Sequence, residues 1–290
     1  MAVKGRFVIQ VAKRLAVRAI APALRVAARP YIAGPSIGDA LRVATGIRSH
    51  GHQITIGLWD GPGDVAEDVA IGYIDALEHL ATTDRSAYLS IKLPALEYSI
   101  ELLDRTIGRS IQLGTRLHFD SLAPDTADRS WSMLQDRAGG HQNIGCTLPG
   151  RWRRSVGDAD RAVHHDWFVR VVKGQWADPE APEIDPRRGF LAVIESLAGR
   201  ARHVSVATHD VPLAMRSMEI LQRTETPCDL ELLFGLPKRP SLKAVSGLST
   251  DVRFYIPYGT SYLPYALSRA RENPRLVWWL VRDAVSGAFR

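Results

Sequence analysis

Residues 167–173 read Trp-Phe-Val-Arg-Val-Val-Lys, an apolar and β-branched run that closes on a cation. Such a run is typical of a strand in a parallel sheet, because both faces of that sheet are covered. Seven more runs of this kind recur along the chain, at Gln53–Trp59, Ala87–Leu93, Thr115–Asp120, Asn143–Leu148, His203–Thr208, Cys228–Phe234 and Val252–Pro257. The sequence therefore predicts eight strands.

The stretches between these runs have apolar residues at i, i+3 and i+4, a spacing that predicts helices. The clearest of them are Val65–Leu80, Leu102–Ile107, Phe190–Leu197 and Val211–Leu221. An N-cap with an acidic first turn is predicted after Pro35, at Ser36 and Asp39. Strands that alternate with helices form a parallel sheet, and eight is the number of strands that closes a barrel.

The expected fold class is α/β, a (β/α)8 TIM-like barrel with an N-terminal helical extension and a C-terminal helix. We expect residues 1–34 to be a basic amphipathic helical segment and residues 35–290 to be the barrel. A doubly wound open sheet is the alternative. That fold normally has a glycine-rich phosphate loop after its first strand, and Asp-Gly-Pro-Gly at residues 60–63 is a poor version of it. The chain also contains no Walker loop.

Length and composition agree with one large domain. The chain has 290 residues, of which 46% are hydrophobic and 23% charged, enough to bury a large core. The two cysteines, Cys146 and Cys228, exclude a disulfide framework and a zinc cluster, and favour a reducing compartment. The composition of His164-His165-Asp166 is that of a metal cluster, but consecutive residues point to opposite faces of a strand, so we expect no metal.

The net charge of +6 belongs to the N-terminal segment. Residues 1–38 contain seven lysines and arginines and no acidic residue, so the rest of the chain is nearly neutral. Nucleic-acid binding is not expected, because it requires basic residues spread across a folded face. Three interpretations of this segment stay open: helices packed on the body, a helix on an anionic membrane surface, and a targeting peptide.

Ionisable residues fall at the predicted strand ends. The active site of a (β/α)8 barrel is built at the carboxyl ends of its strands. The residues there, with those of the following helix, are Lys92, Asp120, Arg170, Lys173, Thr208, His209, Asp210, Glu231, Tyr255, Tyr265, Arg269 and Glu272. These residue types suit an anionic cofactor and an amino-acid substrate. Structural alternatives exist, such as a Lys92–Asp120 ion pair, a hydrogen-bonded His209 at a helix start and a surface pair of Arg269 with Glu272.

Several of these segments resemble motifs of proline dehydrogenases. Residues 169–174, Val-Arg-Val-Val-Lys-Gly, resemble the family's RLVKG strand, and residues 207–210, Ala-Thr-His-Asp, resemble its ATHN motif. Residues 232–235 resemble a strand that ends in LYG, and residues 253–259 resemble RxYxPYG. The stretch Tyr265–Asn273 is similar to the closing helix, YLxRRLxEN. The motifs occur in the family's order over residues 30–290.

This resemblance implies a flavin dehydrogenase, with FAD across the carboxyl ends of the strands. The flavin would receive a hydride from the carbon beside a secondary-amine nitrogen, with Arg170 near its N5 side. The other residues implied at the cofactor are Lys173, Gly174, Thr208, His209 and Glu272. Arg269 would bind the substrate carboxylate, and Lys92 and Asp120 would set charge and orientation at the substrate. Leu233, Tyr255 and Tyr265 would form the walls of the substrate pocket.

The sequence departs from the family pattern at several positions that the resemblance places near the substrate or the cofactor. Ser268 replaces the first of two consecutive arginines, and Trp176, preceded by Gln175, stands where a tyrosine is usual. The strand end at residues 147–150 lacks a QAY-like sequence, and Glu183 replaces a basic residue at the pyrophosphate, for which Arg187 and Arg188 are candidate substitutes. One hypothesis is therefore a preference for another cyclic or N-alkyl amino acid over proline. The alternative class is a catalytically inactive barrel that serves as a binding or scaffold module.

Electrons from the flavin would go to a membrane quinone, as is typical of the family. A basic N-terminal segment docked at a bilayer would serve that transfer. We therefore expect a cytoplasmic protein that binds a small amino acid, with a peripheral contact to the inner membrane through its N-terminus.

Overall fold

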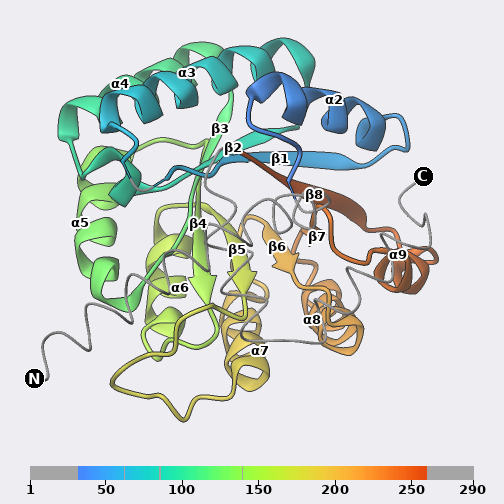
Figure 1. Cartoon of the computed structure of the whole chain (residues 1–290). Coiled ribbons are helices and arrows are strands. Elements are labelled where there is room, and N and C mark those ends of the chain that lie inside the picture. The colour runs from blue at the N-terminus through green and yellow to red at the C-terminus, as the bar shows by residue number, and fades with distance from the viewer. Residues whose placement is uncertain (1–31, 62, 85, 139, 260–290) are drawn as a thin grey trace, which may run out of the picture.

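Eight parallel strands form a closed barrel within residues 32–259, the part of the chain that the computed structural model describes apart from residues 62, 85 and 139 (Figure 1). The strands follow one another around the barrel in chain order, and β1 closes it by pairing with β8. Their bounds are β1 Gln53–Leu58, β2 Tyr88–Ile91, β3 Arg116–Phe119, β4 Ile144–Pro149, β5 Phe168–Val172, β6 Val204–Ala207, β7 Cys228–Leu233 and β8 Asp251–Tyr258.

Helices surround this barrel on its outside (Figure 1). Their bounds are α2 Ile37–Arg48, α3 Ala66–Thr83, α4 Ile100–Leu113, α5 Ala127–Ala138, α6 Ser155–His164, α7 Pro186–Leu197, α8 Val211–Arg223 and α9 Arg239–Val245, with 3-10 turns η2 Leu93–Leu96 and η3 Pro124–Thr126. Side chains cap several of their amino ends. Ser36 and Asp39 form a reciprocal capping box on α2, while Asp185 and Asp210 accept backbone N–H bonds at the starts of α7 and α8.

The two faces of each strand differ in chemistry. Apolar side chains such as Ile54, Leu89, Val171 and Val206 point outward to the helices and are fully buried there. Because side chains alternate along a strand, their neighbours point into the barrel, and many of these are polar or charged. The inward set includes Thr55, Tyr88, Ser90, Arg116, His118, Thr147, Arg170, Ser205, Asp229, Glu231, Arg253 and Tyr255. The hydrophobic core thus lies between barrel and helices, and the barrel interior is a polar layer.

An ion pair near the amino ends of the strands stabilises the lower part of this interior. Arg253 Nε donates to Asp229 Oδ2 at 2.8 Å, and Nη1 donates to the carbonyl oxygens of Ile54 at 2.8 Å and Ser86 at 3.1 Å. Burial would raise the pKa of Asp229, but the charges of Arg253 and His203 and hydrogen bonds from Arg253 and Ser205 together outweigh it and lower the pKa below its usual value. The pair therefore joins β1, β7 and β8 where the barrel closes.

The barrel prediction is confirmed, and the doubly wound alternative is wrong. The predicted strands agree with the observed ones within two residues at either end. Helices were expected between all the strands, but no bounds were predicted for α5, α6 and α9, because their sequences are polar or short. The N-terminal segment up to residue 31 and the predicted closing helix after residue 259 lie outside the described residues. None of the described helices has the length and apolar character to cross a membrane.

Gly145 on β4 leads to a stability test. A Cβ atom there would lie 2.3 Å from His118 Nδ1 and 3.0 Å from the carbonyl oxygen of Phe168. We expect Gly145→Ala to lower the free energy of unfolding by about 1–3 kcal/mol, since the buried His118 ring has to move. Urea denaturation measures the effect.

The matched control is Gly108→Ala in α4, where an added Cβ would contact nothing within 4 Å. Alanine is the better helix former, so this change should raise the free energy of unfolding by up to about 1 kcal/mol. Equal effects of the two substitutions would contradict the packing argument.

Candidate active site

Arg170 lies at the centre of the barrel interior, with all five of its N–H donors in use. Its Nε and Nη2 donate to the two oxygens of Glu231 at 2.8 and 2.9 Å. Nη1 donates to Asp120 Oδ1 at 2.6 Å and to Ser90 Oγ at 3.1 Å, and Nη2 also reaches the Tyr88 hydroxyl at 3.3 Å. One side chain from β5 therefore binds groups on β2, β7 and the end of β3.

Burial determines the electrostatics of this cluster. The side chain of Arg170 is 4% exposed, that of Glu231 2% and that of Asp120 16%. Burial would lower the pKa of the guanidinium, but the negative charge of Glu231, with a smaller effect of Asp120, raises it well above its usual value. Arg170 is thus a permanent cation between two carboxylates.

Asp120 connects Arg170 to an aromatic residue on the opposite side of the barrel. Its Oδ2 accepts a hydrogen bond from the Tyr255 hydroxyl at 3.2 Å, while its Oδ1 accepts one from Ser90 at 2.8 Å. Burial, with a smaller effect of Asp120, raises the pKa of Tyr255 well above its usual value, so the hydroxyl stays a neutral donor. Trp59 in turn donates to the Tyr255 hydroxyl.

Gly57 on β1 makes room for that hydroxyl. A Cβ atom at this position would lie only 2.1 Å from the Tyr255 oxygen and 2.5 Å from its Cζ. Any larger residue would displace the ring, so the glycine fixes where Tyr255 meets Asp120.

Lys92 lies at the same end of the barrel but has a different partner from the predicted one. Its Nζ donates to Asp60 Oδ1 at 2.9 Å and to the carbonyl oxygen of Leu58 at 2.6 Å. The suggested Lys92–Asp120 ion pair is therefore wrong, because Asp120 is engaged by Arg170 and the end of β1 supplies Asp60 instead. The ammonium group of Lys92 therefore lies at the barrel mouth with its charge balanced by Asp60.

Basic side chains lie at the rim above β4, β5 and β6. Lys173 and Arg187 share one carboxylate, that of Asp210, each at 3.3 Å. Arg151 Nη1 donates to the carbonyl oxygen of Gln175 at 3.1 Å, and Gly174 beside it has a φ of 90°, which favours glycine. A half-exposed basic surface of this kind suits the phosphates of a dinucleotide.

His209 has a structural role in this geometry. Its Nε2 accepts a hydrogen bond from the backbone N–H of Leu233 at 2.9 Å, which leaves the proton on Nδ1 to donate to the carbonyl oxygen of Pro237 at 3.1 Å. Burial lowers its pKa. The side chain therefore joins the loop after β6 to the loop after β7, as the structural alternative predicted, while its predicted contact with a cofactor remains a prediction.

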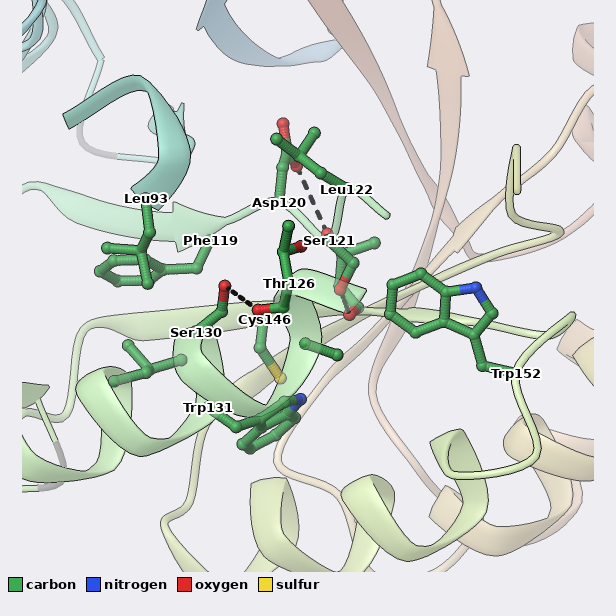
Figure 2. Close-up of a pocket in the computed structure, with 13 residues that line it drawn as sticks. Leu93, Phe119, Asp120, Ser121, Leu122, Thr126, Ser130, Trp131, Cys146 and Trp152 are labelled. Carbon is green, nitrogen blue, oxygen red and sulfur yellow. Dashed lines mark hydrogen bonds between the residues drawn. The ribbon is translucent and has the colours of Figure 1, made fainter. Parts of the chain in front are cut away.

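A small pocket opens beside Asp120, between the ends of β3 and β4 and helix α5 (Figure 2). Figure 2 shows Asp120 at one edge of the pocket, with Trp131 and Cys146 on the opposite side and Trp152 toward the rim. The indole N–H of Trp152 donates to the carbonyl oxygen of Trp176 at 3.1 Å, and Trp176 itself is 41% exposed. The predicted substrate residue Trp176 is thus joined through its backbone to a residue that lines this pocket.

The structure brings a majority of the predicted site residues to one end of the barrel. Those described there are Lys92, Asp120, Arg170, Lys173, Gly174, Trp176, Thr208, His209, Leu233 and Tyr255. Tyr265, Ser268, Arg269 and Glu272 lie outside the described residues. The sequence reading missed Trp59, Asp60, Tyr88 and Ser90. Side chains alternate along β2, which places Tyr88, Ser90 and Lys92 on one face. This alternation could have identified Tyr88 and Ser90 as residues of the site.

Comparison with known proteins finds sequence relatives of similar length. Proline dehydrogenase 1 of Bacillus subtilis (strain 168) is 24% identical over 267 residues, which cover 86% of this chain and 88% of the relative. Proline dehydrogenase 2 of the same organism is 20% identical over 269 residues, with the same coverage. No protein-family model matches the chain.

Solved structures of proline utilization A (PutA) share the fold. PutA from Bdellovibrio bacteriovorus, inactivated by N-propargylglycine, superposes with a TM-score of 0.74 at 18% identity over 93% of this chain. PutA from Corynebacterium freiburgense gives 0.66 at 16% identity over 92%. The chain spans about a third of each PutA chain, 34% and 33% respectively.

The chain is therefore similar in sequence to proline dehydrogenases over most of its length, and its closed eight-stranded barrel has the fold of the PutA structures.

Proposed function

We propose that this protein is an FAD-dependent dehydrogenase that oxidises proline or a related secondary-amine amino acid. The observation that carries the proposal is the Arg170–Asp120–Tyr255 cluster at the carboxyl ends of the strands, in which Arg170 is buried and the other two residues are partly buried. The sequence relatives named proline dehydrogenase support the same chemistry. FAD, when bound, would supply the hydride acceptor that such an oxidation requires.

The residues at the rim fit FAD. Its diphosphate would lie against Lys173 and Arg187, which have one carboxylate between them, and against the backbone at Gly174. Thr208 and His209 would border the cofactor on the β6 side, and Glu272 would contact its ribose or adenine. Arg170 would place a fixed positive charge below the flavin ring, which stabilises negative charge gained on reduction.

The substrate would lie above Asp120, between Lys92 and Tyr255. Lys92 and Arg269 would bind its carboxylate, while Leu233, Tyr255 and Tyr265 would exclude water from the reacting carbon. Tyr255 stays a neutral hydrogen-bond donor and holds Asp120 in place, so the carboxylate remains oriented toward the amine. Ser268 stands where the family has an arginine and Trp176 where it usually has a tyrosine, which favours a cyclic or N-alkyl amino acid other than proline.

An absorption spectrum of the purified protein tests the proposal directly. We expect a flavin spectrum that bleaches without oxygen when a secondary-amine amino acid is added, because the flavin accepts the hydride. Bleaching by L-proline would mean that proline is a substrate and that Ser268 affects only how tightly it binds. Bleaching by another cyclic or N-alkyl amino acid but not by L-proline would support the altered specificity. A colourless protein that gains no flavin on addition of FAD would contradict the proposal and favour the inactive barrel.

Tyr255→Phe tests the role of the aromatic residue. Loss of one hydrogen bond to a buried carboxylate costs about 1–3 kcal/mol, so flavin reduction should slow by roughly 5- to 150-fold while FAD stays bound. Anaerobic stopped-flow absorbance measures the rate.

Tyr258→Phe is the control on the same strand. Its hydroxyl points outward and donates to the carbonyl oxygen of Gly72 at 3.5 Å, far from Asp120 in the fold. We expect a rate within about twofold of the unmodified protein, because so long a hydrogen bond contributes little. Equal rates for both variants would remove Tyr255 from the proposed mechanism.

We also propose that the electrons pass to a membrane quinone and that the basic segment at residues 1–34 contacts the bilayer. The seven cations of residues 1–38, without a single acidic residue, support this placement. The full chain should sediment with anionic phospholipid vesicles at low salt and be released at high salt. Failure to sediment at low salt would contradict the membrane contact, and failure of a soluble quinone to reoxidise the reduced protein would contradict the acceptor.

A further inference from the structure

Glu231 contacts Arg170 with both of its carboxylate oxygens. Oε2 accepts from Nε at 2.8 Å and Oε1 accepts from Nη2 at 2.9 Å. Two parallel bonds fix the plane of a guanidinium, which one bond cannot do. The Tyr88 hydroxyl donates to Oε2 at 3.1 Å, so the carboxylate itself is held from a second strand.

Glu231 is buried and forms its salt bridge with Arg170. Its side chain is 2% exposed, and among the described residues Arg170 is the cation with which it forms a salt bridge. A buried carboxylate is strongly destabilising without a partner of opposite charge. The presence of Glu231 in the barrel interior is therefore explained by Arg170.

Arg170 forms salt bridges with two carboxylates. One guanidinium faces the carboxylates of Asp120 at 2.6 Å and Glu231 at 2.8 Å. Of the two, Asp120 also binds Tyr255 at the barrel mouth, whereas Glu231 contacts only residues of the interior in the described chain. Glu231 thus affects the barrel mouth in two ways: it fixes the position of Arg170, and its negative charge adds to the electrostatic potential there.

We infer that Glu231 is a positioning residue that holds Arg170 in place and lowers the reduction potential of the bound flavin. This inference rests on the proposed function, since it requires FAD above Arg170. A negative charge below the ring opposes the electrons that the flavin gains, and so offsets part of the stabilisation that Arg170 provides. The balance between the two charges would set how readily the flavin passes its electrons onward.

The test measures the midpoint potential of the flavin in the holoenzyme by spectroelectrochemistry. Glu231→Gln keeps the size of the side chain and removes its charge, so we expect a potential more positive than that of the unmodified protein. Asp229→Asn is the matched control, because Asp229 is also buried on β7 and paired with an arginine, but lies two residues closer to the amino end. Its shift should be clearly smaller, since its charge lies farther from the carboxyl ends.

Glu231→Asp is the second variant, and it allows the inference to be tested even if Glu231→Gln does not fold. It keeps the charge but shortens the side chain, so the potential should match that of the unmodified protein while the thermal unfolding midpoint falls. An unchanged or more negative potential in Glu231→Gln, or a clear positive shift in Glu231→Asp, would overturn the inference. Absence of flavin in the unmodified protein would overturn the proposed function along with it, whereas normal flavin with unshifted variants would overturn the inference alone.

Discussion

A guanidinium in the middle of a barrel has to be neutralised from several directions at once, and this requirement organises the upper half of the molecule. The charge of Arg170 is balanced by carboxylates on β7 and at the end of β3, and hydroxyls on β2 accept further hydrogen bonds from it. Because an unpaired buried charge is so unfavourable, these strands must keep their register for the cluster to exist. The candidate active site is therefore also the element that fixes the upper barrel.

Stability comes from the other face of the same strands. The outward side chains are almost all apolar, and they pack against the helices with large buried residues such as Tyr73, Trp167 and Phe190. This division frees the interior for polar chemistry, since burial of apolar surface, the dominant favourable contribution to folding, is supplied outside the barrel. Glycines at 57 and 145 then give the large interior rings of Tyr255 and His118 their space.

The strands could be predicted from the sequence because each is a short apolar or β-branched run. Helices were expected between all of them, but no bounds were predicted for α5 and α6, because polar residues such as Asp128, Arg137 and Asp158 interrupt their apolar spacing. Strand-end residues identified the site, but their partners could not be predicted. An ion pair of Lys92 with Asp120 was one alternative, but Lys92 binds Asp60, because pairing across a barrel depends on side-chain direction and on the loop after β1. Residues after 259, which include Arg269, lie outside the described part of the chain.

The lower pair, Arg253 with Asp229, shares no direct salt bridge or hydrogen bond with the cluster of Arg170. The interior thus contains two layers of ion pairs, one near the amino ends of the strands and one near their carboxyl ends. The Tyr88 ring lies between them, 4.6 Å from the Arg253 guanidinium and 5.7 Å from that of Arg170. A change in either layer that moved this ring would therefore be felt in the other layer, so Tyr88 couples closure of the barrel to the candidate active site.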